Sequence, residues 1–193
     1  MIRKIFTAVI LLAMFFLGQN VHAAPNISYQ VHVQDYGWMR TVSEDEVAGT
    51  VGENRRLEAI IINCSDDIEY NALVQDYGWE GWVHSGVVAG TVGEGRRMEA
   101  IRIKLTGSSA SKYDVYYRAH VQNYGWQGWV KNGEPAGTVG RELRLEALQI
   151  KIVRKGSNYD RDDYDRYEDY ERNRYDRDRR EHERYGRYGY GRY

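Results

Sequence analysis

The sequence contains a single cysteine, Cys64, among its 193 residues. A lone thiol cannot form an internal disulfide, so the fold must depend on packing for its stability. Cys64 ends an apolar run that begins at Ile60. This position favours a small buried side chain over a thiol that pairs with a second molecule.

An excess of charge of one sign is also missing. Lysine and arginine number 27, aspartate and glutamate number 28, and the formal net charge is −1. Nucleic-acid-binding proteins carry a basic excess on the surface that meets the phosphates, so this balance argues against a nucleic-acid partner.

Long apolar runs are confined to the start of the chain, at residues 5–17. Arg3 and Lys4 precede the run, and Ala23 and Ala24 follow it, which is the layout of a secretory signal peptide. A membrane anchor needs roughly 20 apolar residues, so we favour cleavage over anchoring. We predict that residues 1–24 are removed, that no membrane span remains, and that the protein is secreted or held in the cell envelope.

Motifs of the common enzyme classes are absent from the sequence. It has no G-x-S-x-G, no H-E-x-x-H and no Walker loop. His32 and His120 fall on the polar side of an expected strand, where solvated histidines are a simpler interpretation than metal ligands. We therefore expect no catalytic residues, no metal and no cofactor.

What the sequence does contain is one unit written three times. Gln-Asp-Tyr-Gly-Trp occurs at 34–38 and 75–79, and Gln-Asn-Tyr-Gly-Trp occurs at 122–126. Three copies of about 40 residues align without gaps. They span residues 27–64, 68–105 and 115–152, and residues 106–114 form a polar linker. We assign residues 25–155 to one domain.

Each copy has the pattern of β-strands. In the third copy Tyr117, Ala119 and Val121 alternate with polar residues, which predicts a half-buried strand. Trp-Gln-Gly-Trp-Val predicts a second strand, and the Arg-Leu-Glu-Ala-Leu segment begins a third. A short fourth strand is expected at Ala-Gly-Thr-Val.

A unit of this size buries too little apolar surface to fold alone, so the three copies must share a core. Three β-rich units suit a closed threefold arrangement, because closure removes exposed strand edges. The predicted fold is all-β with pseudo-threefold symmetry. A β-prism is favoured, and a β-trefoil is the alternative.

The repeated motifs resemble the clostridial hydrophobic-W (ChW) repeat over residues 27–152. The third copy carries the matching residues His120-Val121-Gln122, Gly125-Trp126, Trp129-Val130, Gly133, Ala136-Gly137-Thr138, Gly140 and Arg144–Leu148. Thr41, Leu73 and Met98 depart from the pattern. The resemblance implies a secreted or surface-exposed bacterial protein that takes part in adhesion or in binding polysaccharides or proteins. It implies no set of catalytic residues.

The tryptophans are the first candidate binding residues. Trp79 and Trp82 are three residues apart, and an odd separation on a regular strand places them on opposite faces unless a bulge at Gly81 intervenes. Every copy has the first tryptophan, at 38, 79 and 126, as a shared core layer requires. Thr41 replaces the second in copy one, and such an exchange in a core costs about 3–5 kcal/mol. Trp82 and Trp129 are therefore predicted at the surface, with Trp79 and Trp126 as further ligand-binding candidates.

Two Arg-x-Glu pairs, Arg97 with Glu99 and Arg144 with Glu146, are the second group of candidates. By alternation each pair falls on the apolar side of the last strand, at its beginning. A structural ion pair at the edge of the core is the simpler interpretation, and a polar rim for a hydroxylated ligand is the alternative. Glycosidase chemistry needs two carboxylates with unequal roles, and equivalent repeats do not provide that asymmetry.

Residues 156–193 are rich in tyrosine, arginine and aspartate and have no aliphatic side chain, which predicts a disordered tail capable of self-association. Together these features predict a non-catalytic binding module. Its expected partner is a polysaccharide or cell-wall glycan, and the alternative is an extracellular protein in an adhesive or structural role.

Overall fold

The computed structural model describes residues 23–157, and the predicted signal peptide and tail therefore lie largely outside the described residues. Fifteen strands and one short helix make up the described chain. The first repeat contains β1 (Ile27–Val33), β2 (Gly37–Trp38), β3 (Val42–Ser43), β4 (Ala48–Gly49) and β5 (Leu57–Cys64). The second contains β6 (Ile68–Val74), β7 (Gly78–Trp79), β8 (Val83–His84), β9 (Ala89–Gly90) and β10 (Met98–Leu105). The 3₁₀ helix η1 (Ser108–Ser111) lies in the linker, and the third repeat contains β11 (Tyr113–Val121), β12 (Gly125–Trp126), β13 (Val130–Lys131), β14 (Ala136–Gly137) and β15 (Leu145–Arg154).

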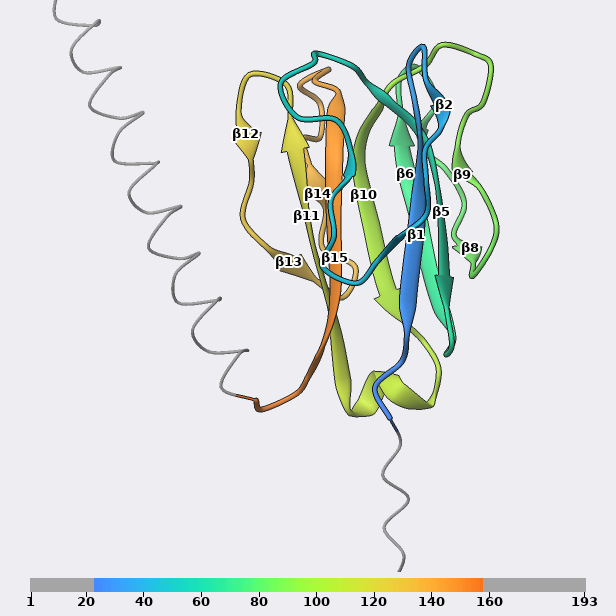
Figure 1. Ribbon diagram of the computed structural model, residues 1–193, viewed down its shortest axis with the longest axis vertical. Coiled ribbons are helices and arrows are strands. Elements are labelled where there is room, and N and C mark those ends of the chain that lie inside the picture. The colour runs from blue at the N-terminus through green and yellow to red at the C-terminus, as the bar shows by residue number, and fades with distance from the viewer. Residues whose placement is uncertain (1–22, 158–193) are drawn as a thin grey trace, which may run out of the picture.

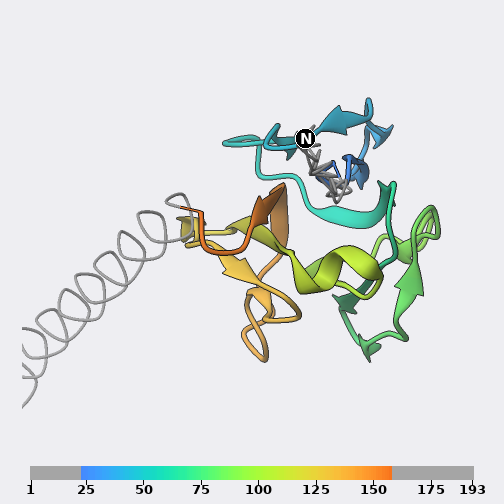
Figure 2. The same ribbon diagram turned by 90° about the horizontal axis from the view of Figure 1, so that it is seen from below.

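The strands form three antiparallel sheets, one for each repeat, and this confirms the predicted all-β fold. Each sheet has two long strands side by side: β1 with β5, β6 with β10, and β11 with β15. We call them sheet 1, sheet 2 and sheet 3 in that order. The long strands run along the long axis of the molecule (Figure 1), and the three sheets surround a common axis when seen end on (Figure 2).

The short fourth strand of each repeat is present, but it pairs outside its own sheet. β9 of the second repeat pairs with β5 of sheet 1, β14 pairs with β10 of sheet 2, and β4 pairs with β15 of sheet 3. Every repeat therefore gives one strand to a neighbour and receives one from the other neighbour. This cyclic exchange covers the free edge of each last strand and closes the ring. The preference for a β-prism over a β-trefoil stays a prediction.

Glycine is required where the exchanged strands cross their neighbours. Gly90 has a φ of +94°, and a Cβ atom on it would lie 2.4 Å from the carbonyl oxygen of Glu58. A Cβ atom on Gly49 or on Gly137 would lie at the same distance from the carbonyl oxygen of Glu146 or of Glu99, respectively. No side chain fits there, so the repeated Ala-Gly dipeptide is explained by the strand exchange.

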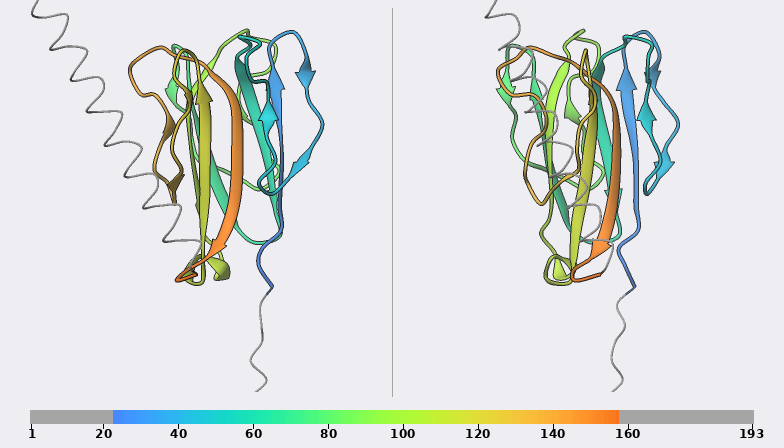
Figure 3. Two further views of the ribbon diagram at one scale, coloured as in Figure 1. Left: turned by 60° about the vertical axis from the view of Figure 1, so that its left-hand side comes forward. Right: turned by 90° about the vertical axis from the view of Figure 1, so that its left-hand side faces the viewer.

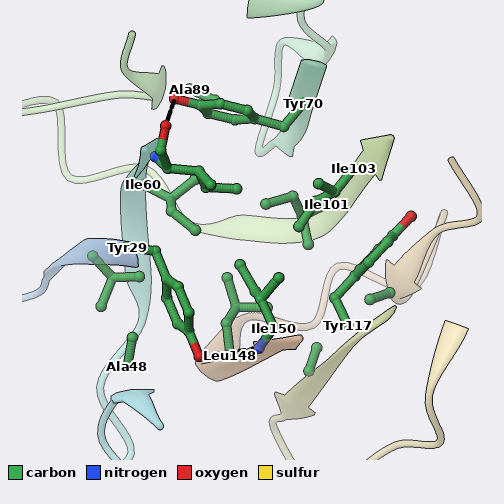
Figure 4. Packing of buried hydrophobic residues seen from close by; sticks show 14 of the residues in the cluster. Tyr29, Ala48, Ile60, Tyr70, Ala89, Ile101, Ile103, Tyr117, Leu148 and Ile150 are labelled. Atoms are coloured by element: carbon green, nitrogen blue, oxygen red, sulfur yellow. Dashed lines mark hydrogen bonds between the residues drawn. The ribbon is translucent and has the colours of Figure 1, made fainter. Parts of the chain in front are cut away.

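The core lies between the three sheets and is built from equivalent positions in each repeat. Alternation on the first long strand points Tyr117, Ala119 and Val121 inward, each fully buried as predicted. The rings of Tyr29, Tyr70 and Tyr117 spread around the inner isoleucines and leucine of the last strands (Figure 4). Cys64 packs against this core but is only partly buried, so it is less buried than the sequence predicted.

The buried tyrosine hydroxyls connect neighbouring repeats. Tyr70 accepts a hydrogen bond from the backbone N–H of Ile62 in sheet 1 and donates one to the carbonyl of Val87 in its own repeat. Tyr29 makes the equivalent pair of bonds to Ile150 and Glu46. Burial raises the pKa of all three tyrosines, that of Tyr117 to about 12. The neutral hydroxyl is therefore an integral part of the core.

Both ends of the described chain leave at the lower end of the molecule, and the turns after the first long strand lie at the upper end (Figures 1 and 3). These turns need residues that tolerate positive φ. Asp35, Asp76 and Asn123 hold φ values of 65–67°, as aspartate and asparagine do more readily than other side chains. The Asp/Asn-Tyr-Gly phrase is thus a tight turn that sends the chain back along the outside of each sheet.

Candidate functional site

All five tryptophans lie in these returning segments, and none of them enters the core. Trp38, Trp79, Trp82, Trp126 and Trp129 are the tryptophans of the chain, and each is exposed or partly exposed. Trp38 is 37% exposed and Trp82 is 39% exposed. The candidate site is therefore the outer face of each sheet, which we define as the face turned away from the shared core.

None of the five indoles, including that of Trp38 in β2, is part of the buried core; all five lie on the returning segments between the turn and the next short strand. The prediction that Trp38, Trp79 and Trp126 form an inward core layer was therefore wrong. Residues 80–82 between β7 and β8 are not in a strand, so the alternation assumed for Trp79 and Trp82 does not apply to them. Both tryptophans of a repeat lie on the outer side.

On sheet 2 each tryptophan is stacked against a cation from the last long strand. The guanidinium of Arg102 lies 4.0 Å from the ring centroid of Trp79, and the Lys104 amine lies 4.3 Å from that of Trp82. Arg102 and Lys104 are two residues apart on β10, so they share the outer face. Cation–π contacts of this kind contribute about 0.5–2 kcal/mol and hold the rings in place.

Sheet 3 places one guanidinium between two indoles. Arg118 lies 4.8 Å from the ring centroids of both Trp126 and Trp129. The Lys151 amine lies 4.1 Å from the Trp129 centroid, in the position that Lys104 has on sheet 2. Nε of Arg118 also donates to Oε1 of Gln149, 2.9 Å away on the neighbouring strand.

Sheet 1 lacks this arrangement. Thr41 stands where the second tryptophan lies in the other repeats, and Asn63 stands where they have lysine. The remaining indole, Trp38, packs edge-on against the His32 ring with 5.4 Å between centroids. A hollow of about 520 Å³ lies beside this sheet, with Ser43 and Asn63 in its wall.

The Arg-x-Glu pairs are ion pairs, but they lie on the outer side of the sheet. Nη2 of Arg97 is 2.8 Å from Oε1 of Glu99, and Arg144 holds Glu146 at the same distance. The register of the two long strands shifts between Met98 and Ala100. This bulge turns the glutamate away from the apolar face on which alternation had predicted it.

The bulge brings two of the glutamates to histidines of the first long strand. Nδ1 of His120 lies 3.1 Å from Oε2 of Glu146, and His32 has the same contact with Glu58 at 3.0 Å. In sheet 3 both carboxylate oxygens are thus engaged, one by Arg144 and one by His120. The arrangement supports the structural interpretation of these pairs, and a role for them at a ligand's rim stays a prediction.

Sequence reasoning missed the cations on the outer faces. A usable signal was present in the cross-strand pairs. Sheet 2 pairs Asn71 with Arg102, and sheet 3 pairs Arg118 with Gln149. The arginine has changed strand, yet each pair keeps one arginine and one amide. The equivalent pair in sheet 1 is Gln30 with Ile61, which has no charge.

Residues 23–157 contain no group of three or more His, Cys, Asp or Glu side chains placed to hold a metal ion. Within the same range, no helix has the length and apolar character needed to cross a membrane.

The fold and its outer faces define an all-β protein of three repeats that exchange a short strand around a closed ring. The family model described as Clostridial hydrophobic W matches residues 32–66, 74–107 and 120–154, so the chain belongs to the ChW family. Repeats of this family are typically extracellular or surface-associated modules. No curated protein and no solved structure matches the chain.

Proposed function

We propose that this protein is an exported, non-catalytic module that binds polysaccharide through the outer faces of sheets 2 and 3. The observation that carries the proposal is the position of the tryptophans outside the core. Trp82 is 39% exposed, and none of the five indoles belongs to the buried core. A flat indole on a surface stacks on the apolar face of a sugar ring, and its N–H can donate to a hydroxyl.

The fixed geometry of the indoles supports this proposal. A ring held by a cation has lost much of its freedom before a ligand arrives, so less entropy is lost on binding. On sheet 3 Arg118 contacts both Trp126 and Trp129, which makes the pair a single rigid surface. The glutamates favour binding over catalysis, because the carboxylate of Glu146 is already engaged by Arg144 and His120.

The proposal is tested by retention of the purified protein on insoluble polysaccharides and on purified cell wall. A Trp82→Ala/Trp129→Ala double variant is expected to lose about tenfold or more in affinity, because it removes one stacking surface from each of the two faces. Trp38→Ala is the matched control, since Trp38 has almost the same exposure on the face that lacks the cations.

Retention by the wild type and by Trp38→Ala, with loss in the folded double variant, supports the proposal. Equal retention of all three proteins contradicts the assignment to these indoles. If none of the three is retained on any glycan, the polysaccharide proposal fails.

A second candidate function is binding to an extracellular protein through the upper end of the molecule. Three tyrosines and three valines are exposed in equivalent turns and loops there: Tyr36, Tyr77, Tyr124, Val51, Val92 and Val139. Exposed apolar side chains gathered in one region are typical of protein interfaces. Crosslinking at the cell surface would identify such a partner, and Val51→Asp with Val92→Asp would be expected to abolish the crosslink.

A further inference from the structure

The outer faces of the three sheets differ in charge in one consistent direction. From sheet 2 to sheet 3, Glu69 is replaced by Tyr116, Glu80 by Gln127, and His84 by Lys131. Two acidic side chains are lost and one permanent cation is gained. The same three positions in sheet 1 are Ser28, Met39 and Ser43, which carry no charge.

Both acidic side chains of sheet 2 are engaged by groups of the protein. Glu69 lies 2.8 Å from the amine of Lys104, and the hydrogen bond from this lysine lowers the pKa of Glu69. Oε2 of Glu80 accepts a hydrogen bond from the backbone N–H of Gly90. On sheet 2 the charge of Lys104 is therefore offset locally by Glu69. Arg102 is stacked on Trp79 and forms no ion pair within residues 23–157.

Sheet 3 carries three cationic side chains on its outer face. Arg118, Lys131 and Lys151 all contact aromatic rings of this face. Asp114 lies beside them, with its oxygens 3.6 Å from the amine of Lys131 and 3.4 Å from that of Lys155. The side chains of this face are therefore more cationic in composition than those of sheet 2, although the whole chain has a formal net charge of −1.

The arginine at the centre of each face is the second observation. It comes from β10 in sheet 2 and from β11 in sheet 3, but it belongs to the same cross-strand pair. A guanidinium forms planar, bidentate hydrogen bonds with carboxylate and phosphate groups while its face stays on an aromatic ring. Sheet 1, without the second tryptophan, has no cation in this pair.

We propose that the outer face of sheet 3, and more weakly that of sheet 2, binds an acidic polysaccharide, with an indole stacked on a sugar ring and the central arginine bonded to its carboxylate or phosphate. The inference rests on the proposed polysaccharide-binding function and names the class of ligand. Arg118 supplies the specific contact on sheet 3. Lys151 is buried beside Trp129 and contributes through its charge rather than by touching the ligand.

The experiment compares polymers that differ only in charge. The purified protein is titrated by calorimetry with polygalacturonate and with its methyl ester, and then with dextran phosphate and with dextran. We expect each acidic polymer to bind about tenfold more tightly than its neutral partner, and increasing salt to reduce that difference. The two pairs of polymers distinguish a carboxylate ligand from a phosphate ligand.

Two variants make the test specific. Arg118→Gln removes the arginine of the more basic face and is expected to reduce the preference of the protein for the acidic polymer. The double variant Arg118→Gln/Arg102→Gln is expected to abolish this preference. Arg96→Gln is the matched control, because Arg96 is also stacked on an aromatic ring, that of Tyr77 at 4.3 Å, but pairs with Asp76 at the loop end.

Equal affinity for the acidic and neutral polymers overturns the inference and leaves the proposed function intact. A preference that survives Arg118→Gln with Arg102→Gln, or that is lost equally with Arg96→Gln, also overturns it. Absence of binding to all four polymers and to the cell-wall materials described above would remove the proposed function itself.

Discussion

Sheets 1 and 3 have similar interiors and different outer faces. Inside, Tyr29 and Tyr117 occupy the same position, both are fully buried, and the pKa of both is raised by burial. Outside, Thr41 and Asn63 of sheet 1 stand where sheet 3 has Trp129 and Lys151, respectively. An interior side chain contacts the other two repeats, so a change in one copy affects the packing of all three.

The stacked indoles and cations of the outer faces contact one another within a single sheet, so one copy can change there with less effect on the others. Departures from the repeat are therefore more informative outside than inside. Thr41 was the departure visible at once in the sequence, and the structure adds Asn63 and Ile61 to it. These three residues mark sheet 1 as the face without the second tryptophan and the stacked cations.

The largest expected effect tests the shared interior. Gly49→Ala, in the strand that crosses sheet 3, and Gly90→Ala, in the strand that crosses sheet 1, each place a Cβ atom 2.4 Å from a backbone oxygen. Backbone strain and overpacking together predict a loss of about 3 kcal/mol or more in the free energy of unfolding. Urea denaturation measures this loss, and the two variants should lose similar amounts.

Gly81→Ala is the control for these variants, because no atom lies within 4 Å of a Cβ atom at Gly81 and its φ is not in the left-handed region. A Gly49→Ala variant as stable as the wild type would show that the strand exchange is not equivalent around the ring.

A smaller effect is expected from alkaline pH. Tyrosine in an unfolded chain has a pKa of about 10, whereas burial raises the pKa of Tyr117 to about 12 and that of Tyr29 further. Above pH about 10 the unfolded state binds fewer protons than the native state, so stability falls as the pH rises. The stabilisation is complete below pH about 10 and is lost as the pH rises towards the native pKa values.

Each tyrosine contributes at most about 1.4 kcal/mol per pH unit in that window. Urea midpoints at pH 8, 10 and 11 measure the slope, and Tyr29→Phe and Tyr117→Phe should each make it shallower. Tyr36→Phe, at an exposed position, is the control and should leave the slope unchanged. If only one of Tyr29→Phe and Tyr117→Phe makes the slope shallower, the interiors of sheets 1 and 3 are not equivalent.

Much of the interior was predictable because it follows local rules. The alternation of Tyr117, Ala119 and Val121 fixed which face of the strand is buried, and the threefold repeat predicted a shared core. The partners of β4, β9 and β14 were not predictable, because strand exchange joins segments from different repeats and leaves no local pattern. The same alternation failed at Glu99 because of a bulge, and it failed for the pair Trp79 and Trp82 because a non-strand segment separates them and leaves Trp79 outside the core.

The smallest expected effect comes from rebuilding the outer face of sheet 1. Thr41→Trp, Ile61→Arg and Asn63→Lys together give this sheet the groups that sheet 2 carries at the same positions. The hollow beside Ser43 and Asn63 leaves room for larger side chains. A third binding face should raise the affinity for an acidic polysaccharide by about threefold to tenfold through multivalency, measured by the calorimetric titration with polygalacturonate.

Thr41→Trp alone is the control that supplies the indole without the cations. If it gives the whole gain, the cations serve only to hold the rings; if the triple variant folds and gains nothing, the difference between the sheets does not govern binding.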